Sequence, residues 1–275
     1  MKKLCLLFRK SMSYLFVVCM VVCFLPKPAV AQQNSNLFIV VDLMKVKPGN
    51  DVKYLELEQN VFKPIHQERI NQGIIVAWFL YQVVYVGDND PYNYVTVNVY
   101  ADPTKLETPY AGIDFNKILP GKDLNLIMEE TVKARTIVQE QLMRRVNFAY
   151  PEGGENLGPH KYIVVNYMKT KPGGNYVQLE NQIGQPTAAE LVKSGAWSGW
   201  TFWSNVYPSG TNMAADYVTV DYYSDFTKVG SFNYMEAFQK AHPDKEWAET
   251  MQGFSNSRDM IRTELWKLLD AAIAE

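Results

Sequence analysis

The chain contains two similar copies of one unit, and this repetition constrains its fold more than any other feature of the sequence. The segment VDLMKVKPG, which begins at Val41, returns as VNYMKTKPG from Val165, and YVTV at Tyr94 returns at Tyr217. Two like units on one chain can pack together and complete a core that neither completes alone. The sequence therefore predicts a tandem arrangement.

A segment rich in turn-forming residues separates the two copies. Residues 151–159 read PEGGENLGP, a composition typical of a linker. We therefore predict a first repeat over 32–150 and a second repeat over 160–275. Each has a size that is usual for a domain.

The N-terminus has the pattern of a signal peptide. Basic residues between Lys2 and Lys10 precede an apolar run from Leu15 to Leu25, and small residues follow up to Ala31. The run is short for a membrane span. We expect residues 1–31 to be removed and the mature protein to be exported, to the periplasm or the extracellular space, without stable membrane insertion. An uncleaved N-terminal anchor is the alternative.

Cysteine usage and charge limit the chemistry of the mature protein. All three cysteines (Cys5, Cys19 and Cys23) lie in the predicted leader, so we expect no disulfide and no thiolate metal ligand. The leader also holds five of the 27 lysine and arginine residues and none of the 29 acidic residues, which leaves a formal charge of −7. This acidic balance argues against nucleic acid as a partner.

Each copy predicts the same succession of elements. A strand runs into a Lys-Pro-Gly turn and an amphipathic helix, two strands follow as a hairpin, and a long helix closes the copy. Pro64 and Pro186 interrupt the first helix of each copy at the same place, which predicts a kink. The predicted strands and closing helices are 37–46, 75–86, 93–100 and 122–145 in the first copy, and 161–170, 197–207, 217–223 and 245–272 in the second.

The order β-α-β-β-α is that of a ferredoxin-like half barrel. The strands are apolar on both faces, since Phe38, Val40 and Met44 alternate with Ile39, Val41 and Leu43. This pattern fits a sheet covered by helices on one side and by a second sheet on the other. We therefore predict an α+β fold in which two tandem ferredoxin-like βαββα(β) repeats form an intrachain α/β barrel.

In its first strand, Lys-Pro-Gly turn, proline-interrupted helix and β-hairpin, each copy resembles the dimeric α/β-barrel superfamily. This superfamily includes antibiotic-biosynthesis monooxygenase-like, stress-responsive and NIPSNAP-like proteins. One departure concerns the fourth strand, which VNFAY at 146–150 supplies in the first copy, whereas DAAIA at 270–274 favours a helix in the second. We therefore expect the two copies to close the barrel unequally.

Arginine lies within an apolar stripe on each predicted closing helix. At about 100° per residue, Arg135 and Arg258 both fall among apolar residues of their helices. Glu58 and Glu180 lie within or beside the apolar stripe of the first helix of each copy. A buried charge is costly unless it is paired, so each arginine is expected to meet an acid or to bind an anionic ligand.

The first and third strands exchange an acid and an amide between the copies. Asp42 and Asn98 of the first copy become Asn166 and Asp221 in the second. Neighbouring positions in a sheet would explain the exchange, because either arrangement leaves one carboxylate beside one amide.

The third strand also separates polar from apolar residues by parity. Tyr94 shares its face with Asn98, whereas Val95, Val97 and Val99 lie on the other face. We expect the polar face to meet the helices and the valines to fill the barrel. The predicted ligand-binding residues are Arg135, Glu58, Asp42, Asn98, Tyr94 and Trp78 in the first copy, and Arg258, Glu180, Asn166, Asp221, Tyr217 and Trp200 in the second.

Three interpretations of these residues stay open. They form a structural network without a ligand, or they line a cleft in each repeat that binds a small, partly apolar molecule. The third is a cofactor-independent monooxygenase-like or isomerase-like enzyme, as the resemblance implies, in which Tyr94, Asp42 and Arg135 orient or protonate the substrate. Trp78 and Trp200 are typical of core packing, with an aromatic pocket as the alternative.

The histidines do not indicate a metal site. His66, His160 and His242 lack the spacing of metal ligands, and His66 lies off the apolar stripe, where we expect it to be exposed. Some members of the superfamily ligate haem through a helix histidine, but the pattern here predicts no metal and no cofactor. The sequence also lacks a P-loop, a nucleophile elbow and a dinucleotide fingerprint. Oligomeric state is not fixed by any of these features.

Overall fold

The computed structural model describes residues 36–152, 158 and 160–274. The predicted leader (1–31) and most of the predicted linker lie outside the described residues. No described helix combines the length and the apolar character that crossing a membrane requires.

Eight antiparallel strands form a closed barrel in the order β1-β3-β2-β8-β5-β7-β6-β4. The strands are β1 (Phe38–Val46), β2 (Ala77–Val84), β3 (Tyr94–Tyr100), β4 (Arg135–Ala149), β5 (Tyr162–Thr170), β6 (Gly199–Tyr207), β7 (Tyr217–Tyr223) and β8 (Arg258–Ile273). Strand β4 pairs with β1 and with β6, and β8 pairs with β5 and with β2. Strands from the two halves of the chain therefore share one sheet.

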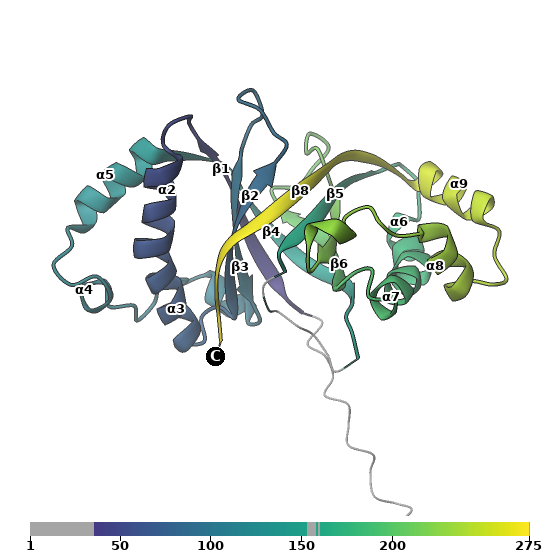
Figure 1. The fold of residues 1–275 in the computed structure, drawn as a ribbon, viewed down its shortest axis with the longest axis horizontal. Helices are drawn as coiled ribbons and strands as arrows, with labels where there is room; N and C mark the ends of the chain where they lie inside the picture. Colours follow the sequence, from purple (N-terminus) through teal and green to yellow (C-terminus); the bar gives the residue numbers. More distant parts are fainter. Residues whose placement is uncertain (1–35, 153–157, 159, 275) are drawn as a thin grey trace, which may run out of the picture. The chain divides into compact units, whose positions relative to one another are not determined.

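The helices lie outside the barrel in two groups (Figure 1). The first-half helices are α2 (Asp51–Leu57), α3 (Lys63–Asn71), α4 (Phe115–Ile118) and α5 (Leu124–Ala134), and the second-half helices are α6 (Tyr176–Leu179), α7 (Gln185–Lys193), α8 (Tyr234–Ala241) and α9 (Trp247–Ser257). Two 3₁₀ turns, η2 (Pro103–Leu106) and η4 (Phe226–Lys228), follow β3 and β7. The element order of the first half thus recurs in the second.

The long closing helices predicted over 122–145 and 245–272 are wrong. Helix α5 ends at Ala134 and α9 ends at Ser257, and the chain continues directly into β4 and β8. Residues 270–274, where a helix was expected, include the end of β8. Each of these strands has a partner on both sides, and that pairing outweighs the helical spacing of the apolar residues. The second half therefore has a full fourth strand.

The barrel interior is apolar and draws on both halves. Val95, Val97 and Val99 lie in the interior cluster with Ile163 and Val220. Tyr94 and Trp78 belong instead to a second cluster beneath the first-half helices. The predicted orientation of β3, with its polar parity toward the helices and its valines in the barrel, is confirmed.

A π-helical turn precedes each of the two helix prolines. Segments η1 (Glu58–Phe62) and η3 (Glu180–Gly184) are π-helical, and Pro64 and Pro186 follow in the first turn of α3 and α7. A proline cannot donate to the residue four positions earlier and its ring crowds that carbonyl group, so a wider turn accommodates it. The interruption predicted at Pro64 and Pro186 is thus a π-helical turn. Both π turns begin at a buried glutamate, Glu58 or Glu180.

We predict that Gly174→Ala destabilises the protein where α9 gives way to β8. A Cβ atom at Gly174 would lie 2.7 Å from the Cα atom and from the carbonyl oxygen of Ser257. Because both are backbone atoms, the chain must shift, at a cost of about 1–3 kcal/mol. At Gly253, inside α9, the nearest atom is Leu179 Cδ1 at 3.8 Å. Gly253→Ala should be neutral or stabilise by up to about 1 kcal/mol. Urea denaturation measures both, and an unchanged Gly174→Ala variant would contradict this geometry.

Candidate functional site

Glu58 and Arg135 meet between the first-half helices and the sheet. Glu58 opens the π turn η1, and Arg135 is the first residue of β4, directly after α5. Glu58 Oε1 lies 3.9 Å from Arg135 Nε, and the carboxylate is buried. Burial raises the pKa of Glu58 to about 7, although the Arg135 guanidinium acts to lower it. The carboxyl group is therefore partly protonated near neutral pH.

Asp42 lies on the face of the sheet that meets the first-half helices, and it is paired with a second acid, Glu140. Thr96 Oγ1 donates a hydrogen bond of 2.9 Å to Asp42 Oδ2, and Asp42 is the register partner of Glu140 on β4. Burial, and then the charge of Glu140, raises the pKa of Asp42 to about 6, against the hydrogen bond from Thr96 and the charge of Arg135. Two carboxyl groups with raised pKa values thus lie around one guanidinium.

Asn98 accepts a hydrogen bond from Arg69, whereas Asp42 accepts one from Thr96. Arg69 is fully buried and donates to Asn98 Oδ1 at 2.8 Å, to Tyr100 Oη at 2.6 Å and to His66 Nδ1 at 2.8 Å. Its guanidinium also lies 4.5 Å from the ring centroid of Tyr110. A buried charge is here held by neutral groups and an aromatic face.

The prediction that His66 is exposed is wrong. His66 is buried and stacks on Trp78, with the ring centroids 4.9 Å apart. Burial and the charge of Arg69 lower the pKa of His66 to about 3. The sequence did hold a signal for this pair, because Arg69 continues the apolar stripe of Val61 and Ile65 by one more step of four residues.

A groove of about 620 Å³ adjoins Arg135 on the outside of the first half. Its walls are mainly apolar, and Met128 and Val132 of α5 stay 56% and 72% exposed there. The Nε atom of Arg135 is buried and has no hydrogen-bond partner in the part of the chain that the structure describes. The lining residues are Phe62, Ile65, Tyr110, Phe115, Met128, Thr131, Val132, Arg135, Thr136 and Ile137.

The second half repeats the buried acids. Burial raises the pKa of Glu180 to about 7, against its neighbours Tyr176 and Arg258, and burial likewise raises the pKa of Asp221 to about 7. Asn166 Nδ2 donates to Asp221 Oδ2 at 3.1 Å, so the predicted contact between acid and amide occurs in this half. The Arg258 guanidinium lies over the ring of Tyr176 at 6.0 Å.

Aromatic side chains fill the space beside these second-half residues. Helix α8 packs on α7 and buries Phe238, whose ring lies 5.2 Å from that of Trp247. Phe254 is buried where the repeat places Thr131 in the first half. The two halves therefore share a polar pattern but differ in the access that a ligand would have to it.

The remaining predicted site residues have structural partners. Tyr94 Oη donates to Asp51 Oδ1 at 2.8 Å, and Tyr217 stacks on Phe202. Trp78 and Trp200 are both buried in the clusters beneath the helices. The structure thus brings Arg135, Glu58 and Asp42 together beside the groove, while Asn98 and Tyr94 bond elsewhere.

A haem ligated by a helix histidine does not fit the described residues. His66 accepts from Arg69, His160 Nδ1 lies 3.0 Å from Ser198 Oγ, and His242 Nε2 lies 3.2 Å from the carbonyl oxygen of Ile183. Each histidine therefore already has a partner. Within the same part of the chain, no three histidine, cysteine or acidic side chains are grouped so that they could hold a metal ion.

The comparison with known proteins shows the fold. No family model matches the sequence, and no curated protein matches it. Among solved structures, a monooxygenase candidate from Lactobacillus acidophilus NCFM has a TM-score of 0.51 at 7% identity over 87% of this chain and 96% of that one.

An anthrone oxidase-like protein and a chlorite dismutase candidate each have a TM-score of 0.50. Their identities are 12% and 10%, and the matches cover 87% and 86% of this chain and 94% and 96% of theirs. The structural neighbours are thus antibiotic-biosynthesis monooxygenase-like and chlorite dismutase-like proteins of ferredoxin-like fold. At such identities the likeness concerns the fold alone.

We predict that the folded protein loses stability as the pH rises from about 5 to about 8. The carboxyl groups of Glu58 and Glu180 have pKa values near 7, above their ordinary value of 4.5. Between these values the folded state binds more protons than the unfolded state, so each group favours folding at the acidic end of the window. That contribution is lost as the pH rises through the pKa of the folded state. The loss lowers the free energy of unfolding by about 1–3 kcal/mol per group.

Urea denaturation across this pH range tests the assignment. Glu58→Gln and Glu180→Gln should each flatten the pH dependence, because the amide does not titrate. Glu129→Gln is the control, since Glu129 is exposed on α5. A stability that rises with pH over this interval, or a slope that both variants leave unchanged, would contradict the raised pKa values.

Proposed function

We propose that the first-half groove binds a small, partly apolar molecule that carries a carboxylate or another anionic group. The observation that carries the proposal is Arg135, which adjoins an open apolar groove and whose buried Nε atom has no hydrogen-bond partner among the described residues. The acid beside it, Glu58, lies 3.9 Å away and has a pKa of about 7. Near neutral pH the positive charge is therefore only partly compensated, and an anion would complete it.

The apolar walls define the rest of the ligand. Met128, Val132 and Ile137 are exposed around the groove, and Phe115 and Tyr110 add aromatic surface. Apolar groups this exposed gain free energy when a ligand covers them. We therefore assign an aryl or branched aliphatic body with one acidic group.

One anion-binding groove per chain follows from the difference between the halves. The prediction from sequence placed a cleft in each repeat, and we now assign binding to the first half, because Phe238 and Trp247 pack into the second. We retain the proposals that the two halves are tandem copies and that the mature protein is exported.

An enzyme of the cofactor-independent monooxygenase or isomerase type is the second candidate. Asp42 and Glu58 have pKa values of about 6 and about 7, which suit general acid–base catalysis near neutral pH. The fold of the structural neighbours is compatible with this. However, Glu180 and Asp221 have equally raised pKa values beneath packed aromatic side chains. We therefore rank binding above catalysis.

Isothermal titration with phenylacetate tests the binding proposal. Arg135→Gln should weaken binding by at least about tenfold, because it removes the charge that holds the carboxylate. Arg258→Gln is the matched control and should bind as the parent does. Phenylacetamide, which lacks the charge, should bind the parent weakly. Equal binding by Arg135→Gln, or an equal loss in both variants, would overturn the assignment.

The affinity should also depend on pH. Below the pKa of Glu58 the protonated acid does not compete for Arg135, whereas above it the carboxylate does. Phenylacetate affinity should therefore fall as the pH rises from about 6 to about 8, and Glu58→Gln should remove most of this dependence. Oxygen uptake and product analysis on the same samples separate binding from turnover.

A further inference from the structure

The interior of the barrel holds a cavity that is separate from the groove. Its volume is about 80 Å³, and aliphatic side chains from both halves line it. Ile39 and Val99 come from the first half, and Ile163 and Val220 come from the second. A volume of this size exceeds what one water molecule needs.

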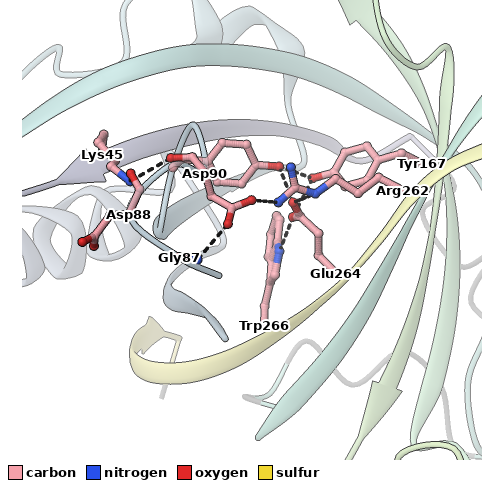
Figure 2. A network of polar contacts seen from close by, with 9 residues as sticks. Lys45, Gly87, Asp88, Asp90, Tyr167, Arg262, Glu264 and Trp266 are labelled. Atoms are coloured by element: carbon pink, nitrogen blue, oxygen red, sulfur yellow. Dashed lines mark hydrogen bonds and ion pairs between the residues drawn. The ribbon is translucent and has the colours of Figure 1, made fainter. Parts of the chain in front are cut away.

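A polar network closes the barrel beside this cavity (Figure 2). Glu264 accepts hydrogen bonds of 2.8 Å from Trp266 Nε1 and from Tyr92 Oη, and Arg262 Nε lies 2.5 Å from its carboxylate. Arg262 also bonds to Asp90 of the β2–β3 loop at 3.1 Å. The network therefore ties β8 to that loop across the barrel end.

Two aromatic residues connect the network to the cavity. Tyr167 Oη and Trp266 Nε1 both point to Glu264, and the rings of both residues line the cavity. Lys45 Nζ holds the same loop through the carbonyl oxygens of Asp88 and Asp90. Since these polar atoms are satisfied by Glu264, the rings present apolar surface to the interior.

Gln141 is a polar residue that also lines the cavity. It lies on β4, where the repeat places the counterpart of Glu264, and only 8% of its surface is exposed. Its amide oxygen is buried without a hydrogen-bond partner in the described part of the chain. An unpaired buried acceptor destabilises the folded state, so a donor in the cavity would stabilise the folded protein.

We propose that the barrel interior is a second binding site, which takes a small apolar alcohol whose hydroxyl group donates to Gln141 Oε1. The aliphatic and aromatic walls would bury the hydrocarbon part. The site uses residues of both halves and is independent of Arg135. The proposal for this site can therefore be tested independently of the proposal for the groove.

Methyl-resolved NMR with two isomeric probes tests this site. 1-Butanol and methyl propyl ether have the same atoms, but only the alcohol can donate a hydrogen bond. In the wild-type protein 1-butanol should shift the methyl signals of Ile39, Val99, Ile163 and Val220, and leave Val132 in the groove unchanged. The ether should bind at least about tenfold more weakly.

Variants on β4 provide the matched comparison. Gln141→Leu should remove the preference for the alcohol, while Arg144→Gln, on the exposed face of the same strand, should keep it. If Gln141→Leu does not fold, the two probes on the wild-type protein still decide. Equal binding of both probes, or interior methyl signals that neither probe moves, would overturn the proposal.

Discussion

The double pairing of β4 and β8 is the constraint on which the rest of the structure depends. Each of these strands bonds to a strand of its own half and to one of the other half. Without the second partner, each half would expose a row of unpaired backbone groups along a long edge. The same pairing forces the chain out of helix at Ala134 and Ser257, and so places Arg135 and Arg258 at the ends of strands, beside Glu58 and Glu180.

The two halves of the barrel share one backbone arrangement but differ in the space beneath their helices. In the second half, Phe254 and Phe238 fill the space under the helices, and Leu191 occupies the place of Arg69. In the first half, Arg69 and its partners form a polar network, while α4 is a single short turn and the groove stays open. Ligand access thus depends on the size of a few side chains rather than on the fold.

The internal repeat and the alternation of Val95, Val97 and Val99 were sufficient to predict the half-barrel order and the face of each strand. They did not show where α5 and α9 end, because the spacing of apolar residues in 135–149 and 258–273 fits a helix until partners on both sides are known. The contact of Arg135 with Glu58 could be predicted from buried charge alone. The groove could not, since it depends on where α4 and α5 lie.

An engineered disulfide between β2 and β8 tests the shared barrel most directly. Gln82 and Lys267 are register partners across the two halves, and without residues 1–31 the chain has no other cysteine. Paired strand residues lie within the reach of a disulfide. Gln82→Cys with Lys267→Cys should form one intramolecular bond under mild oxidation, whereas Gln82→Cys with Thr263→Cys should not. Free thiols or only intermolecular products in the first variant would contradict the closed barrel.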